Sequence, residues 1–237
     1  MPAIEITARF DQGFSWGHAG HGLLECRSHA LRDADGHIWL IDPLDGEGLD
    51  AALVELGGDV AGVIVLLDRH FRASVEIAER HGARMLVPPG KWGKFGVHFE
   101  HAETYHASAL DCPFTFLPVI EKQGQWIEYA LWWSEERVLV VPEALGTASY
   151  YRSRAKEPLA VHPVLRVLAP PRRLVGVAPE AELLLVGHGE SMHGAIAESI
   201  ALAVGEARRE LPFYALAAPR HAVKWARAMF GMGRSSC

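Results

Sequence analysis

The sequence predicts a mixed α/β protein in which two β-sheets pack face to face and helices cover their outer faces. Three observations predict this architecture. Strand-like runs and helical segments alternate as βββαβαβ before further strands and the final helices. Each helix carries an apolar stripe to bury, and each sheet needs both of its faces covered. With 237 residues, 49% hydrophobic and 22% charged, the chain can fill such a core.

In chain order, apolar and β-branched runs predict strands, and apolar residues at helical spacing predict helices. We expect strands at about residues 3–10, 22–31, 37–42, 62–67, 83–87, 113–118, 126–133, 137–142 and 182–186. We expect helices at about residues 48–57, 73–82, 191–210 and 219–230. Ser191 is the expected N-cap of the third helix.

Glycine and proline residues predict a turn-rich loop over residues 88–96 and an irregular crossing over residues 158–171. Alternation along the strand at 126–133 places Trp126 and Trp132 on one face and Trp133 on the other. We expect residues 1–237 to form one domain, with 219–230 as an amphipathic C-terminal helix packing against it.

Composition argues against several classes of protein. The net charge is -6 and acids and bases are interleaved, so no basic face is expected for nucleic acid. The first twenty residues contain no apolar signal region, and no stretch approaches the length of a membrane span. Cys26, Cys112 and Cys237 fit neither a disulfide framework nor a Cys-x-x-Cys metal knuckle. These features favour a soluble cytoplasmic protein that binds neither nucleic acid nor membrane.

A strand-loop-helix unit carries the most informative polar residues. The apolar run Val63–Leu67 leads into Asp68, Arg69 and His70, and helical spacing then continues from Ser74 to a stop at Gly82. Polar side chains at the carboxyl end of such a strand lie where open α/β folds place their ligands.

Together with its surroundings, this unit resembles the metallo-β-lactamase fold superfamily. Upstream, the strands closing on Asp42-Pro43 are similar to the paired strands of that family. Downstream, the strand closing on Gly187-His188-Gly189 is similar to the family's last strand and turn. The resemblance covers roughly residues 20–205 and implies a four-layer αββα sandwich.

The resemblance also implies where metal ligands would lie. Two-metal members use a His-x-His-x-Asp-His block after this strand, which here reads Asp68, His70, Arg72 and Ala73. The next family histidine has no counterpart in residues 123–130. Glu143 stands where a bridging aspartate is expected, and His188 matches the last histidine. Arg72 places a fixed positive charge beside the expected cations.

Three hypotheses follow from this set. In the first, no metal is bound, and the site binds a small polar or anionic molecule or has lost catalysis. Arg72 would then pair with Asp68 or Glu143. In this hypothesis no catalytic residue is assigned, no cofactor is needed, and the ligand-binding residues are Asp68, His70, Arg72, Glu143 and His188.

In the second hypothesis, one Zn or Fe ion is held by Asp68, His70, Glu143 and His188, and the protein hydrolyses an ester, thioester or phosphoester. In the third, the protein is an interaction module that uses the cleft or the last helix as its contact surface, and a homodimer is compatible with it.

Overall fold

The computed structural model describes residues 1–18, 24–90, 102–105, 111–153 and 158–216. Its first sheet has seven strands in sequential order, with α1 (Leu49–Leu56) between β4 and β5 and α2 (Ser74–His81) between β5 and β6. The strands of this sheet are β1 (Ile4–Phe10), β2 (Gly13–His18), β3 (Ser28–Arg32), β4 (His37–Ile41), β5 (Asp59–Ile64), β6 (Arg84–Val87) and β7 (Glu103–Thr104). The pairing is antiparallel from β1 to β4 and parallel from β4 to β7.

The second sheet has five strands in the order β14-β13-β10-β9-β8, and in it only β10 and β13 pair in parallel. Its strands are β8 (Thr115–Lys122), β9 (Trp126–Trp133), β10 (Val138–Val141), β13 (Leu183–Val186) and β14 (Met192–His193). A short antiparallel pair, β11 (Leu145–Gly146) and β12 (Ala160–Val161), stands apart from both sheets. Among the described residues, further helical segments are α3 (Pro163–Leu168), a 3-10 turn (Arg172–Leu174), α4 (Ile196–Glu206) and residues 211–216.

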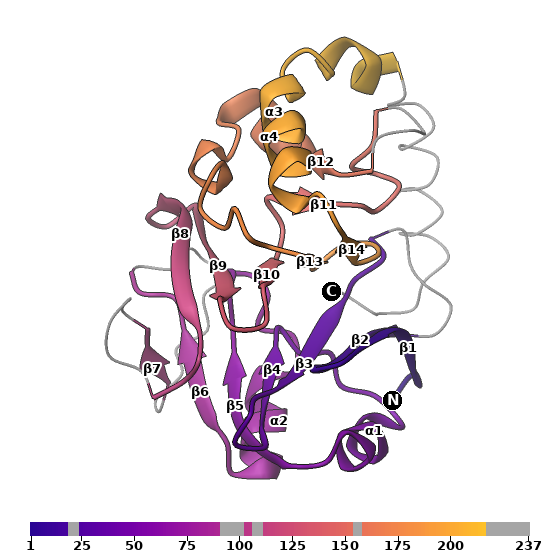
Figure 1. The fold of residues 1–237 in the computed structure, drawn as a ribbon, viewed down its shortest axis with the longest axis vertical. Helices are drawn as coiled ribbons and strands as arrows, with labels where there is room; N and C mark the ends of the chain where they lie inside the picture. The colour runs from indigo at the N-terminus through magenta and orange to yellow at the C-terminus, as the bar shows by residue number, and fades with distance from the viewer. Residues whose placement is uncertain (19–23, 91–101, 106–110, 154–157, 217–237) are drawn as a thin grey trace.

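Buried side chains divide into layers that confirm the predicted αββα sandwich. An inner core lies between the sheets, where Trp39 and Ile64 of the first sheet meet Trp133 and Val140 of the second. Figure 1 shows α1 and α2 at the bottom of the molecule and α3 and α4 at the top, with the strands between them.

Each outer face has its own core. Leu53 and Ile77, from α1 and α2, pack with Val63 on the first sheet. Ile200 of α4 packs with Leu139 and Leu184 on the second sheet, and Leu165 of α3 belongs to the same cluster.

Most predicted strands form within a few residues of their expected bounds, and the alternation of tryptophans is confirmed. Trp126 and Trp132 belong to the outer core of the second sheet, whereas Trp133 points into the inner core. Two expectations are wrong. The supposed irregular crossing contains α3, and α4 begins at Ile196 behind Ala195, so Ser191 is not its N-cap. The expected helix 219–230 and part of the loop 88–96 lie outside the described residues.

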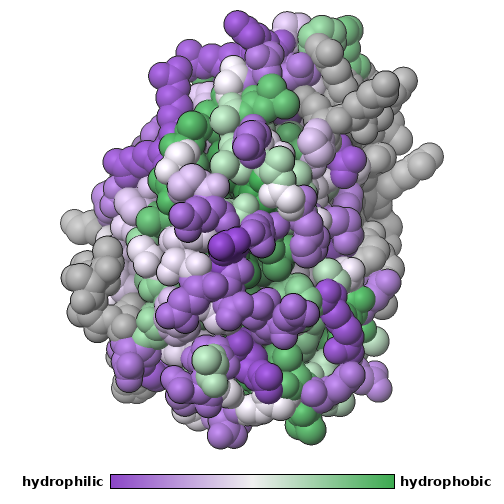
Figure 2. Space-filling view, viewed as in Figure 1, coloured by the Kyte–Doolittle hydropathy of each residue, from purple (hydrophilic) through white to green (hydrophobic). Residues whose placement is uncertain are grey.

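Two surface properties bear on partners. Figure 2 shows hydrophobic residues gathered in the upper part of the molecule, in the area of α3 and α4. Exposed apolar side chains of this region include Val167, Leu168 and Leu202. None of the helices in the described ranges is both long and apolar enough to cross a membrane.

Cys112 is a free, partly buried thiol. Cys26 is disulfide-bonded, which the sequence did not predict.

Candidate functional site

The site forms where the carboxyl ends of four strands meet. Asp42 follows β4, and Asp68 to Arg72 follow the buried continuation of β5. Glu143 follows β10, and His188 follows β13. Since β4 and β5 are parallel, as are β10 and β13, each pair delivers its polar residues to one edge of its sheet.

Backbone hydrogen bonds join the two sheets at this edge. The N–H of Arg27 donates to the Gly187 carbonyl at 2.8 Å, and the N–H of Gly189 donates to the Glu25 carbonyl at 2.8 Å. Asp68 N–H donates across to the Ile127 carbonyl of β9 at 3.0 Å. The residues that follow the strands are therefore held against one another rather than splayed apart.

His70 is buried and oriented by Asp42. The distance between His70 Nδ1 and Asp42 Oδ2 is 3.0 Å, and the other carboxylate oxygen of Asp42 accepts from Leu66 N–H at 2.8 Å. Asp42 adopts a left-handed backbone conformation, with φ of 44°. The Nε2 atom of His70 thus faces the interior of the site, 4.0 Å from Glu143 Oε2.

His188 is oriented in the same way from the opposite sheet. Its Nδ1 atom lies 2.8 Å from the Leu24 carbonyl oxygen, and its ring centroid is 5.4 Å from that of His70. The residue is 3% exposed, and its Nε2 atom is buried and makes no hydrogen bond to any described residue.

Glu143 is held by His162, a residue that the sequence analysis did not single out. The N–H of Val164 donates to His162 Nδ1 at 3.3 Å, and His162 Nε2 lies 3.4 Å from Glu143 Oε1. The other oxygen, Oε2, is buried without a hydrogen-bond partner in the described parts of the chain, although Arg69 Nε is 3.8 Å away.

The first hypothesis expected Arg72 to pair with Asp68 or Glu143, but its hydrogen-bond partners in the structure are other groups. Its Nη1 atom donates to the backbone carbonyls of Arg27 and Asp42 and to Ser28 Oγ. The Nε and Nη2 atoms are buried and make no hydrogen bond within the described residues. The guanidinium is therefore anchored on one side and unsatisfied on the other.

Both carboxylate oxygens of Asp68 accept hydrogen bonds from neighbouring residues of the chain. Asp68 Oδ2 accepts from Ile127 N–H at 3.1 Å, and Oδ1 accepts from Arg69 Nε at 3.4 Å. The Arg69 guanidinium lies 4.1 Å from the ring centroid of Trp126, at cation–π distance. Of the five residues predicted from sequence, Asp68 is the one whose two oxygens are already engaged.

Burial governs the pKa values in the site. Burial, reinforced by Arg72, holds the pKa of His70 well below its usual range. Burial and the neighbouring His70 do the same to the pKa of His188. Both rings are thus neutral near pH 7. Burial also raises the pKa of Glu143 to about 7, against the attraction of Arg69. The pKa of Asp42 likewise rises to about 7, against the attraction of Arg72.

Comparison with solved structures identifies the architecture. The chain is similar to DIM-1 metallo-β-lactamase, with a TM-score of 0.60, 12% identity, and coverage of 87% of this chain and 99% of that one. It is also similar to TMB-1, at a TM-score of 0.57 and 13% identity, and to VMB-1, at 0.55 and 12%. For both, the match covers 87% of this chain and 99% of the other. The chain has a metallo-β-lactamase fold. No protein-family model matches the chain, and no curated protein matches it.

A metallo-β-lactamase fold raises the question of whether the residues present fit metal ions. Atoms of ligand type exist at His70 Nε2, His188 Nε2 and Glu143 Oε2. In the described part of the chain, however, the residues with three such atoms within 4.8 Å of one another are Asp33, Asp35 and His37, at the turn that leads into β4 and at its first residue. The three site residues do not converge that closely, and the Arg72 guanidinium lies beside them. They do not fit a two-ion centre.

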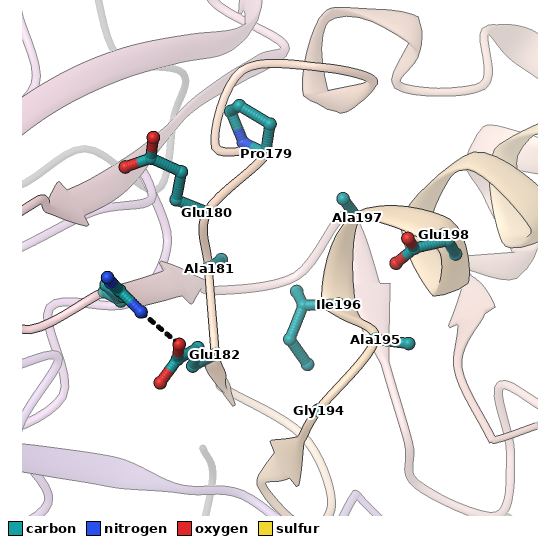
Figure 3. Close-up of a pocket in the computed structure, with 10 residues that line it drawn as sticks. Pro179, Glu180, Ala181, Glu182, Gly194, Ala195, Ile196, Ala197 and Glu198 are labelled. Carbon is teal, nitrogen blue, oxygen red and sulfur yellow. Dashed lines mark hydrogen bonds and ion pairs between the residues drawn. The ribbon is translucent and has the colours of Figure 1, made fainter.

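A hollow lies at the other end of β13 and belongs to no part of this site. It has a volume of about 340 Å³ and lies between residues 179–182 and the start of α4. Glu180, Glu182 and Glu198 line it, and Arg137 is paired with Glu182, as the dashed line in Figure 3 marks.

Three contributors to the site were not predicted from sequence. Asp42 was noted only as part of a turn after a strand, yet it orients His70. His162 lies in a proline-rich segment expected to be irregular, and a His-Pro step before a short helix was its only signal. Glu128 lies in a strand examined for a histidine, and its charge at an otherwise apolar position was the signal.

Proposed function

We propose that this protein binds a small polar or anionic molecule at the strand ends and holds no pair of metal ions there. The observation that carries the proposal is the position of Arg72. Its Nη1 is fixed by two carbonyls and a hydroxyl, which leaves Nε and Nη2 buried and available. A buried guanidinium edge is a donor pair for an oxygen-bearing ligand and disfavours a cation at the same place.

The surrounding atoms support a polar occupant. His188 Nε2 and Glu143 Oε2 are buried without hydrogen-bond partners among the described residues. Buried polar groups of folded proteins are nearly always satisfied, so a molecule that bonds to both is favoured in this position. The site would then use the fold as a binding scaffold, and the residues in it are assigned no catalytic step.

One observation favours a second candidate, a mononuclear metal-dependent hydrolase. His70 and His188 each engage Nδ1 with an acceptor, Asp42 Oδ2 and the Leu24 carbonyl, and turn Nε2 inward. Metal-binding histidines are commonly oriented in this way. A single ion would require His188 and Glu143 to move closer to His70 than they lie here, and it would activate a water for hydrolysis.

Metal analysis separates the two candidates. Protein purified without chelator and dialysed against metal-free buffer is expected to retain far less than about one equivalent of Zn or Fe. About one retained equivalent that disappears in the H70A/H188A double variant would support the hydrolase instead. H18A/H193A is the matched control, because it removes two histidines outside this set.

A further inference from the structure

The groups bonded to Nδ1 of His70 and of His188 determine which ring nitrogen of each histidine carries the hydrogen. The Leu24 carbonyl and an ionised Asp42 can only accept, so Nδ1 of His188 and of His70 carries the hydrogen in each case. A neutral imidazole with its hydrogen on Nδ1 presents Nε2 as a hydrogen-bond acceptor. The site thus presents two imidazole acceptors, one from each sheet.

Glu143 supplies a third acceptor because His162 occupies only one of its oxygens. His162 Nδ1 accepts from Val164 N–H, so its Nε2 carries the hydrogen that points to Glu143 Oε1. Glu143 Oε2 remains, buried and 4.0 Å from His70 Nε2. Three acceptors, one of them a carboxylate oxygen, match the three donors of a protonated primary amine.

Arg72 supplies hydrogen-bond donors, whereas the other three residues supply acceptors. Nε and Nη2 lie on the same edge of a guanidinium, the edge that binds a carboxylate through two parallel hydrogen bonds. Among the described residues this edge has no partner, since the three hydrogen bonds of the group found there are all made by Nη1. Arg72 is close enough to Glu143 and His188 to perturb them electrostatically.

The charges around the site favour an occupant that carries both signs. Arg72 and an ionised Asp42 offset each other, and Arg69 lies 3.4 Å from Asp68 Oδ1 and 3.8 Å from Glu143 Oε2. An anion alone would satisfy Arg72 but face Glu143, and an ammonium ion alone would satisfy Glu143 but leave the guanidinium edge unpaired. A molecule with both groups meets both requirements.

We propose that the ligand carries an ammonium group and a carboxylate, as a small α-amino acid does. The ammonium group donates to His70 Nε2, His188 Nε2 and Glu143 Oε2, and the carboxylate accepts from Nε and Nη2 of Arg72. This inference rests on the proposed function and specifies the class of its ligand. His162 is a positioning residue in this arrangement, because it acts through Glu143.

The test is isothermal titration calorimetry of the full chain, freed of metal, at pH 8. The probes are glycine, alanine, acetate, methylamine and inorganic phosphate. Glycine or alanine is expected to bind at least ~10-fold more tightly than acetate or methylamine, because only the amino acids engage both ends of the site.

Two conservative variants assign the ends of the ligand. E143Q should weaken amino acid and methylamine binding at least ~10-fold and should not weaken acetate binding, because it removes a negative charge that an anion would face. R72K, which keeps the charge and loses the two-bond edge, should weaken amino acid and acetate binding and leave methylamine unchanged. E198Q and R209K, at exposed positions of the α4 region, are the matched controls. Circular dichroism establishes that each variant is folded.

The outcomes distinguish this inference from the proposed function. Acetate or phosphate binding through Arg72 with no preference for glycine or alanine overturns the zwitterion and leaves the proposed function standing. No binding by any probe, together with one equivalent of Zn held by His70 and His188, overturns both. If glycine and alanine do not bind to wild-type protein that circular dichroism shows to be folded, the zwitterion is likewise overturned.

Discussion

Glu128 is the residue on which the position of Glu143 depends. It is completely buried, and Oε1 accepts from the N–H groups of Glu143 and Ala144 at 3.0 and 2.6 Å. Oε2 accepts from Trp126 Nε1 at 2.8 Å. Three donors thus converge on one carboxylate, which fixes the turn after β10 and the direction of the Glu143 side chain.

We predict that Glu128→Gln lowers the free energy of unfolding by about 2–3 kcal/mol. An amide has the same shape but offers only one accepting oxygen, so one N–H donor faces another. Urea unfolding followed by tryptophan fluorescence measures the change. E182Q, at an exposed carboxylate, is the control, and an E128Q variant as stable as wild type would contradict the role given to this residue.

Sequence reasoning at the residue scale found groups that follow strands and missed groups that support them. His70, Arg72, Glu143 and His188 were all selected, and the structure places them at one edge. The partners of Arg72 could not be predicted, because two of them are backbone carbonyls that only the folded chain brings near it. His162 was missed for a related reason: its contact with Glu143 joins segments whose approach no local pattern encodes.

At the scale of elements, the approach of β4 to β5 depends on a glycine. Trp39 and Gly62 are register partners beside an irregularity in the pairing, and Trp39 is 3% exposed in the inner core. A Cβ atom at position 62 would lie 2.5 and 2.7 Å from two atoms of the Trp39 ring. The strand that leads to the site therefore requires a residue without a side chain here.

Gly62→Ala is predicted to destabilise the protein by about 1–3 kcal/mol, because the indole must shift within a filled core. Gly205→Ala is the matched control. Nothing lies within 4 Å of a Cβ at that position of α4, so alanine should be neutral or stabilise by up to about 1 kcal/mol through helix propensity. Thermal unfolding of both variants measures the contrast, and equal melting temperatures would refute the packing argument.

Elements were predictable where a long periodic pattern defined them, as for β9 and α2. Short elements were not. α3 has six residues, and the proline that opens it was interpreted as a breaker, although proline at a first helical position favours a helix. β2 was missed because its buried run, Gly13–His18, contains two glycines and only two apolar residues at alternating positions, Phe14 and Trp16.

At the scale of the whole molecule, two sheets enclose their polar residues at one edge, and this burial makes the stability depend on pH. Burial raises the pKa of Glu143 to about 7 from an ordinary value of 4.5. Between those values the folded state retains a proton that the unfolded state releases, so this contribution to stability is complete below about pH 4.5 and is lost as the pH rises to 7. The lowered pKa values of His70 and His188 act in the opposite direction.

The contribution of Glu143 can be isolated by comparison with Glu143→Gln, because glutamine does not titrate while the histidines remain in both proteins. The difference in unfolding free energy, wild type minus variant, is predicted to fall by roughly 3 kcal/mol between pH 4.5 and 7 and to stay constant above it. Urea unfolding at several pH values measures this difference. A flat profile for E143Q would mean that the Glu143 carboxyl is solvated in the folded protein, and the enclosed acceptor set at the strand ends would then no longer hold.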